Sequence, residues 1–312
     1  MHNRGMKLCC KTITPLVFAC ALAVSIAAQQ PASQGTTPPV DEGQQLLREG
    51  RHAEALAFYK KILAETPDSY QANNQAGVAL DLLGRYEDAR KHFEKAIAAA
   101  PDAEAKSRAT RNMATSYAFS RDCASAAKYQ GPLVDDAIKA GKMTDAAGVA
   151  NELARACLES GDIDRANEWY AKGHDAAVKE PGLAAAQKDL WDFRWEHAQA
   201  RIAARRGNPA DAQKHVAAAK AILDKGTNPE QAPFFPYLTG YVAFYGGDFK
   251  TAVADFGKAN QDDPFIVCMI AQSYEKLGDS TKASEYYKKA LTSNAHNPPN
   301  AYARPIAMKK VS

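Results

Sequence analysis

The sequence predicts an all-α protein, an α-solenoid of about seven helix-turn-helix hairpins. A self-similar period of 34 residues separates Gly50 from Gly84 and Ala55 from Ala89. Apolar residues recur at helical spacing, and no stretch alternates apolar and polar residues for long enough to suggest a sheet. A period of this length is typical of stacked helical hairpins rather than of a closed globular core. Such a stack favours an activity in which another molecule is held along an extended surface.

The chain opens with the pattern of an export signal. A short basic stretch contains Arg4, Lys7 and Lys11, and an apolar run follows it, with small residues before candidate cleavage points. We therefore interpret residues 1–28 as a signal peptide that is cleaved on export to the periplasm or the secreted space.

Two alternatives for this segment stay open, an uncleaved membrane anchor and lipidation at Cys20. The residues that follow, 29–40, are rich in Gln, Pro and Thr and carry no charge. Such a composition cannot bury enough apolar surface to offset the entropy of ordering, so we expect a flexible linker.

The charge balance argues against nucleic acid as a partner. The formal net charge is +3, and the signal peptide carries three of the 39 basic residues and none of the 36 acidic ones. The mature chain is thus balanced and has no overall basic field to attract nucleic acid. Association with a membrane is expected only through the N-terminal segment.

Three of the six cysteines lie in the signal peptide, which leaves Cys123, Cys157 and Cys268. Three is too few for a disulfide scaffold, and the number is odd. The favoured interpretation is buried helical thiols. A bond between Cys123 and Cys157, which fall on neighbouring hairpins, is the alternative in an oxidising compartment.

The second unit serves as the template for a hairpin. Residues 70–83 form its first helix, which Gly84 ends because glycine enters the left-handed conformation without strain. Residues 85–99 form its second helix. Gly77 and Ala89 are small residues at which the two helices can approach closely.

This pattern resembles the tetratricopeptide repeat family. The family's order of small, Gly, aromatic, Ala, aromatic, Ala and Pro residues is carried here by Gly77, Gly84, Tyr86, Ala89, Phe93, Ala96 and Pro101. The first unit matches at Gly43, Gly50, Ala55, Tyr59 and Pro67, with Ile62 in place of the last Ala. Asn73 departs from the family, which often has Trp at this position.

Later units keep the same repeat positions with more variation. The fourth, sixth and seventh units carry it at Gly161, Ala166, Gly247, Ala252, Phe256, Ala259, Pro264, Gly278, Ala283, Tyr287 and Ala290. The third unit is the weakest, and we expect Gly131-Pro132 to interrupt its second helix. The hairpins span residues 41–293, and residues 294–312 are expected to form a C-terminal tail or capping segment.

In such stacks the first helix of each hairpin lines the concave side, and one stripe of that helix should face a ligand. The stripe places five arginines and no acid in units three to five, followed by four aromatic residues in unit six. The predicted partner-binding residues are Asn74, Arg108, Arg111, Asn151, Arg155, Arg194, His197, Arg201, Phe234, Tyr237, Tyr241 and Phe244.

A groove with a basic middle and an aromatic end suits an acidic or C-terminal peptide that carries an apolar anchor. Three alternatives stay open. The register could slip by one residue, the arginines could pair with acids such as Asp122 or Glu168, and the aromatic residues could belong to the core.

No catalytic motif was found. The sequence lacks H-E-x-x-H, G-x-S-x-G, G-x-x-x-x-G-K and C-x-x-C, and its histidines are scattered, so we expect no catalytic residue, no metal and no cofactor. The resulting hypothesis is a non-catalytic scaffold or adaptor for a protein partner in the cell envelope or the secreted space. The alternative is a solute- or glycan-binding module that uses the aromatic residues of unit six.

Overall fold

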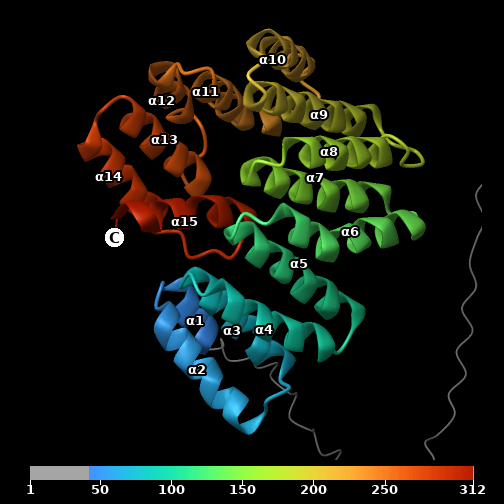
Figure 1. Ribbon diagram of the computed structural model, residues 1–312. Coiled ribbons are helices and arrows are strands. Elements are labelled where there is room, and N and C mark those ends of the chain that lie inside the picture. The colour runs from blue at the N-terminus through green and yellow to red at the C-terminus, as the bar shows by residue number, and fades with distance from the viewer. Residues whose placement is uncertain (1–41, 312) are drawn as a thin grey trace, which may run out of the picture. The chain divides into compact units, whose positions relative to one another are not determined.

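The computed structural model describes residues 42–311, and every regular element in this range is a helix (Figure 1). The expected signal peptide (1–28) and linker (29–40) lie outside the described residues. The prediction of an all-α solenoid is confirmed, because consecutive helices pack in antiparallel pairs from one end of the described range to the other.

Seven hairpins follow one another in residues 42–311, and a single helix comes after the last of them. The helices are α1 (Glu42–Arg48), α2 (His52–Glu65), α3 (Tyr70–Leu82), α4 (Tyr86–Ala98), α5 (Ala103–Phe119), α6 (Cys123–Lys139), α7 (Met143–Ser160), α8 (Ile163–Ala177), α9 (Ala185–Arg205), α10 (Pro209–Leu223), α11 (Phe235–Tyr245), α12 (Phe249–Phe256), α13 (Pro264–Lys276), α14 (Ser280–Ala290) and α15 (Pro298–Val311). A 3₁₀ helix, η1 (Pro229–Phe234), leads into α11.

The close crossing within a hairpin depends on a glycine that faces an aromatic ring. A Cβ atom at Gly77 would lie 2.6 Å from the Phe93 ring, and one at Gly240 would lie 2.7 Å from the Phe256 ring. Both rings are fully buried. The same small-to-aromatic contact occurs in hairpin one, between Gly43 and Tyr59, which explains the spacing that these units repeat.

The turns between paired helices use a residue in the left-handed region, and in hairpins three to seven the side chain of the next residue caps the second helix. Gly84 has a φ of +78°, and in the third hairpin Arg121 adopts the same region with a φ of 59°. The next residue there, Asp122, accepts a hydrogen bond from the Ser125 backbone N–H and so caps α6. Arg121 therefore holds a conformation that L-residues rarely adopt, because the capped turn requires it.

The expected break at Gly131-Pro132 is wrong, since α6 runs continuously from Cys123 to Lys139 with Pro132 inside it. Its buried side, which includes Ala126 and Val134, packs along α7. Tertiary packing of this face outweighs the one backbone hydrogen bond that a proline removes.

The preference for free buried thiols is also wrong for one pair. Cys123, at the start of α6, forms a disulfide with Cys157 in α7, and their Cα atoms are 4.7 Å apart. The two helices are antiparallel neighbours, so the start of one lies beside the last turns of the other. Cys268 remains a free, buried thiol.

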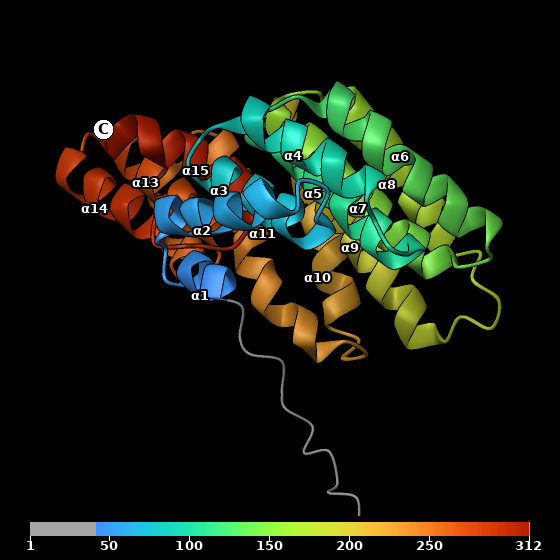
Figure 2. The same cartoon turned by 90° about the horizontal axis from the view of Figure 1, so that it is seen from below.

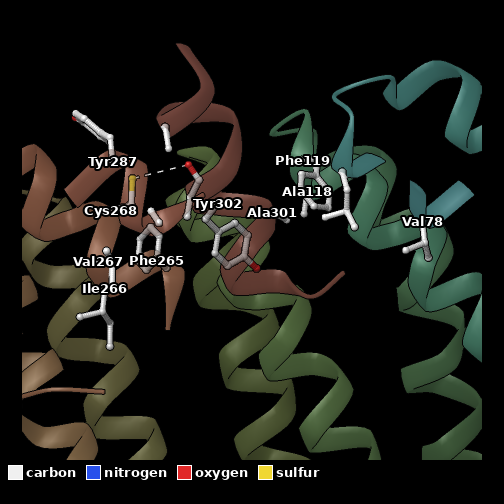
Figure 3. Packing of buried hydrophobic residues seen from close by; sticks show 14 of the residues in the cluster. Val78, Ala118, Phe119, Phe265, Ile266, Val267, Cys268, Tyr287, Ala301 and Tyr302 are labelled. Carbon is white, nitrogen blue, oxygen red and sulfur yellow. Dashed lines mark hydrogen bonds between the residues drawn. The ribbon is translucent and has the colours of Figure 1, made fainter. Parts of the chain in front are cut away.

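The C-terminal segment is not a loose tail. It forms α15, which contacts α13 and α14 of the last hairpin and also α5 and α7 (Figures 1 and 2). The Arg304 Nε donates to the Leu82 carbonyl oxygen at 2.7 Å. In Figure 3, Ala301 and Tyr302 of α15 lie between the side chains Phe265, Val267 and Cys268 of α13 and the side chains Ala118 and Phe119 of α5.

Candidate functional site

The chain itself covers much of the concave stripe. Asn74 is 5% exposed, and its Oδ1 accepts a hydrogen bond from Asn112 Nδ2 at 2.9 Å. Asp81, on the same stripe, is fully buried and pairs through Oδ2 with His296 Nε2 at 2.8 Å. Burial raises the pKa of Asp81 against the opposing hydrogen bond from His296. The expected open groove is therefore absent over unit two, because the segment that leads into α15 occupies it.

Two of the predicted arginines lie in unit three and are exposed. Arg108 pairs with Glu104 at 3.3 Å, and Arg111 pairs with Glu152 of α7. Both line a polar depression of about 390 Å³ that also includes His296. Their charges are compensated by carboxylates, although not by the acids that the sequence had suggested.

A second hollow, of about 440 Å³, lies between α7, α9, η1, α11 and the start of α13. We call it the arginine cleft. It gathers these predicted residues: Asn151, Arg155, Arg194, His197, Arg201, Phe234 and Tyr237. It also gathers Gly148, which shares the stripe expected for unit four, and these residues that the sequence had not indicated: Glu152, Tyr170, Phe193, Gln231, Pro233, Asn260, Asp263 and Ile266.

Arg201 is the most deeply placed charge of the cleft, at 5% exposed. Its Nη2 donates to the Tyr170 hydroxyl at 2.9 Å, and its Nε donates to the His197 carbonyl oxygen at 3.3 Å. Its Nη1 is buried without a hydrogen-bond partner. No carboxylate within residues 42–311 forms an ion pair with this guanidinium, so its positive charge stays uncompensated.

Arg155 is enclosed by aromatic rings from three helices. Its Cζ lies 5.5 Å from the Tyr237 ring centroid, 5.4 Å from that of Phe265 and 5.7 Å from that of Tyr302. Its Nε and Nη2 are buried and have no hydrogen-bond partner. In the described part of the chain it forms no ion pair either, and an arginine stays charged at any pH that a folded protein meets.

No other polar group of the cleft forms an ion pair with Arg155 or Arg201, and the carboxylates of Asp263 and Glu159 act on Arg155 only at longer range. Burial and the nearby Arg201 lower the pKa of His197 well below its usual value, so its ring is neutral. Burial raises the pKa of Tyr237 to about 12, so its hydroxyl keeps its proton. Asp263 caps α13 by accepting from the Phe265 N–H at 2.8 Å, and Glu152 pairs with Arg111.

The wall of the cleft is aromatic. The rings of His197 and Tyr237 stack with centroids 5.6 Å apart, and Phe193 packs against His197. Phe234 is 50% exposed at the mouth. Two guanidinium groups that keep unpaired N–H donors behind an aromatic wall can hold an anion that carries an apolar group.

Two predicted aromatic residues are not part of this cleft. Tyr241 is fully buried, and its hydroxyl donates to Glu159 Oε1 at 3.2 Å. Phe244 packs edge-on against Phe249, with ring centroids 5.5 Å apart. The expected row of four aromatic rings is thus divided: Phe234 and Tyr237 line the cleft, Tyr241 belongs to the core, and Phe244 is half-buried.

The cleft residues that were not predicted from the sequence carry only weak sequence signals of ligand contact. Tyr170 stands at a repeat position of a second helix, which suggests packing rather than ligand contact. Phe193 directly precedes Arg194, so a register shifted by one residue would have included it. Asn260 and Asp263 lie in the connection between hairpins six and seven, where no periodicity applies.

The range of residues 42–311 holds no group of three or more His, Cys, Asp or Glu side chains that could bind a metal ion. Nor does it contain a helix whose length and hydropathy would let it cross a membrane.

Comparison with known proteins found family models described as tetratricopeptide repeat at residues 46–109 and 266–297. A tetratricopeptide repeat protein from Parabacteroides merdae matches with a TM-score of 0.50 and 12% identity, over 86% of this chain and 94% of that one. The apo form of RapI also matches with a TM-score of 0.50 and 13% identity, over 86% of this chain and 96% of that one. At such identities the likeness shows the fold alone. No curated protein matches the sequence.

Proposed function

Because the chain is a tetratricopeptide repeat protein, we propose that it is a non-catalytic scaffold or adaptor that binds a protein partner in the cell envelope or the secreted space. Repeats of this family generally bind other proteins. The observation that supports a binding role here is the arginine cleft, where Arg155 and Arg201 form no ion pair within residues 42–311 and keep three buried guanidinium nitrogens without a hydrogen-bond partner. Burying an uncompensated charge is unfavourable, and such groups cluster where a ligand supplies the missing partner.

The partner segment is acidic or ends in a free carboxylate. A carboxylate would pair with Arg155 and Arg201, since guanidinium groups bind carboxylates by two parallel hydrogen bonds. An apolar side chain of the same segment would lie against Phe193 and Phe234. Only a short stretch of the partner enters, because α15 occupies the neighbouring inner surface.

Two features support an exported location. Residues 1–28 carry the basic and apolar pattern of a signal peptide. The disulfide between Cys123 and Cys157 suits an oxidising compartment, because disulfides persist there and are rare where thiols are kept reduced.

Affinity capture tests this function. The mature chain, from residue 29, is immobilised, incubated with the native envelope fraction, and the retained proteins are identified by mass spectrometry. Parallel captures use the double variant Arg155→Met/Arg201→Met and, as a matched control, Arg108→Met, which removes a stripe arginine outside the cleft. We expect a partner that the wild type and Arg108→Met retain and the double variant loses. Identical captures by all three chains would refute a role for the cleft.

A further inference from the structure

We propose that the arginine cleft is also a binding site for a free small organic acid, with one carboxylate on a compact apolar or aromatic body. Such an acid would compete with the partner segment. Binding of the acid does not depend on the proposed function, whereas competition with the partner segment rests on it.

The first support is the shape of the site. An extended chain cannot run along the whole concave surface, because α15 and the segment before it fill the part next to α3 and α5. Tyr302 of α15 lies beside Arg155, so it closes the cleft on that side. What remains, about 440 Å³, falls within the range of roughly 300–1,000 Å³ that small-molecule pockets occupy.

The second support is the set of unpartnered donors. Nε and Nη2 form the edge of the Arg155 guanidinium that pairs side-on with a carboxylate, and both lack a partner. No hydrogen bond within residues 42–311 holds this side chain, and Arg155 lines the cleft. Nη1 of Arg201 supplies a further donor at its base.

The third support is the balance between charge and apolar surface. His197 is neutral, so the deep part of the cleft carries the two charges of Arg155 and Arg201. Asp263 and Glu152 lie at the same cleft and disfavour a second negative charge on the ligand. The rings of Phe193 and Phe234 provide the surface for the apolar body. A monocarboxylate therefore fits better than a phosphate.

Titration calorimetry tests the site with 3-phenylpropionate and its neutral isostere 3-phenylpropionamide, both added to the mature wild-type chain. We expect the acid to bind at least tenfold more tightly than the amide. This comparison needs no variant, so a folding defect cannot obscure it. Equal binding of acid and amide, or no binding of the acid, would overturn the proposal. Tighter binding of phenyl phosphate than of 3-phenylpropionate would overturn the assignment to a carboxylate.

Variants then place the acid in the cleft. Arg155→Met and Arg201→Met should each weaken binding of 3-phenylpropionate at least tenfold, and Arg108→Met should change it less than twofold. A loss in Arg108→Met equal to that in the cleft variants would place the acid elsewhere.

The two proposals fail separately. If the acid does not bind while partner capture still depends on Arg155 and Arg201, the small-acid site is refuted and the scaffold function stands. If the acid binds as expected and no partner is ever captured, the site is supported and the scaffold function fails. Release of a captured partner by 3-phenylpropionate, but not by the amide, would support the competition. Retention of the partner in saturating acid would refute it.

Discussion

Arg155 shows how a single residue links stability to binding. Its guanidinium lies among Tyr237, Phe265 and Tyr302 without an acid to pair with in the described chain. Contacts with aromatic faces offset part of the desolvation cost of a cation. Two N–H donors of Arg155 nevertheless have no hydrogen-bond partner. A residue of this kind destabilises the empty fold and stabilises the bound one.

Replacing Arg155 by Met should therefore raise the stability of the ligand-free chain. Removal of an uncompensated buried charge by an apolar residue of similar length should add about 1 kcal/mol or more, equivalent to about 2–4 °C in Tm. Thermal unfolding followed by circular dichroism measures the change. Arg111→Met, which removes an exposed and paired arginine, is the control and should not raise Tm. A lower Tm for Arg155→Met would show that the charge is compensated in the fold.

His52 should make stability depend on pH. Burial and the nearby Arg304 lower its pKa from 6.5 to about 4. The unfolded chain therefore takes up a proton between pH 6.5 and 4 that the folded chain does not, so stability is fully present above pH 6.5 and falls as the pH drops. The loss from this group amounts to at most about 3 kcal/mol.

The variant His52→Gln should flatten this dependence. The Tm of the wild type and of the variant would be compared at pH 8, 7, 6 and 5. At pH 8 residue 52 carries no charge in either chain, so the difference in Tm there reports the effect of the substitution on packing alone. Below pH 6.5, we expect the Tm of the wild type to fall more steeply than the Tm of the variant. Parallel curves over the whole range would exclude His52 as the cause.

At the scale of elements, the disulfide fastens the third hairpin to the fourth. The bond closes a loop with a sequence separation of 34 residues. Loop-closure entropy gives a stabilisation of about 3–4 kcal/mol for a loop of this length. The free energy of unfolding in urea should be higher without reductant than with it by this amount. In the double variant Cys123→Ala/Cys157→Ala, reductant should not change the free energy of unfolding. Alkylation of Cys123, Cys157 and Cys268 in the unfolded, unreduced chain would show that the bond does not form.

The crossing of paired helices gives a second prediction at this scale. Gly77→Ala places a methyl group against the Phe93 ring and should destabilise the chain by about 1–3 kcal/mol. Gly148→Ala is the matched control: it also lies inside a helix, but a Cβ there meets nothing within 4 Å. It should be neutral or stabilise by up to about 1 kcal/mol. Chemical denaturation of both variants measures the difference. Equal effects at the two sites would remove the close crossing as the reason for the glycine.

The hairpins could be predicted because their signals are local. Gly84 ends one helix, Pro101 ends the next, and a small residue faces an aromatic one within 16 positions, as Gly77 faces Phe93. The inward stripe of α9 could be predicted for the same reason, and Arg194, His197 and Arg201 do lie together at the cleft. Helical periodicity determines which residues share a face, and it holds over each single helix.

At the scale of the whole molecule, α15 determines what the solenoid can bind. Arg304 and Leu82 are 222 residues apart in the sequence, and their hydrogen bond joins the C-terminal segment to the second hairpin. Neither residue carries a local signal for this contact. The occupation of the inner surface next to α3 and α5 follows from the packing of α15, so it could not be predicted from the repeat pattern.

The central claim is that a partner enters the arginine cleft. The most direct measurement is photo-crosslinking in the native cells with Phe234→p-benzoylphenylalanine, since Phe234 is 50% exposed at the mouth of the cleft. The same crosslinker in place of Lys91, whose side chain is 72% exposed on α4 away from the cleft, is the control. We predict a crosslinked partner from position 234 that disappears when Arg155 and Arg201 are changed to Met, and none from position 91. A partner crosslinked only from position 91, or unchanged by the arginine substitutions, would contradict the account.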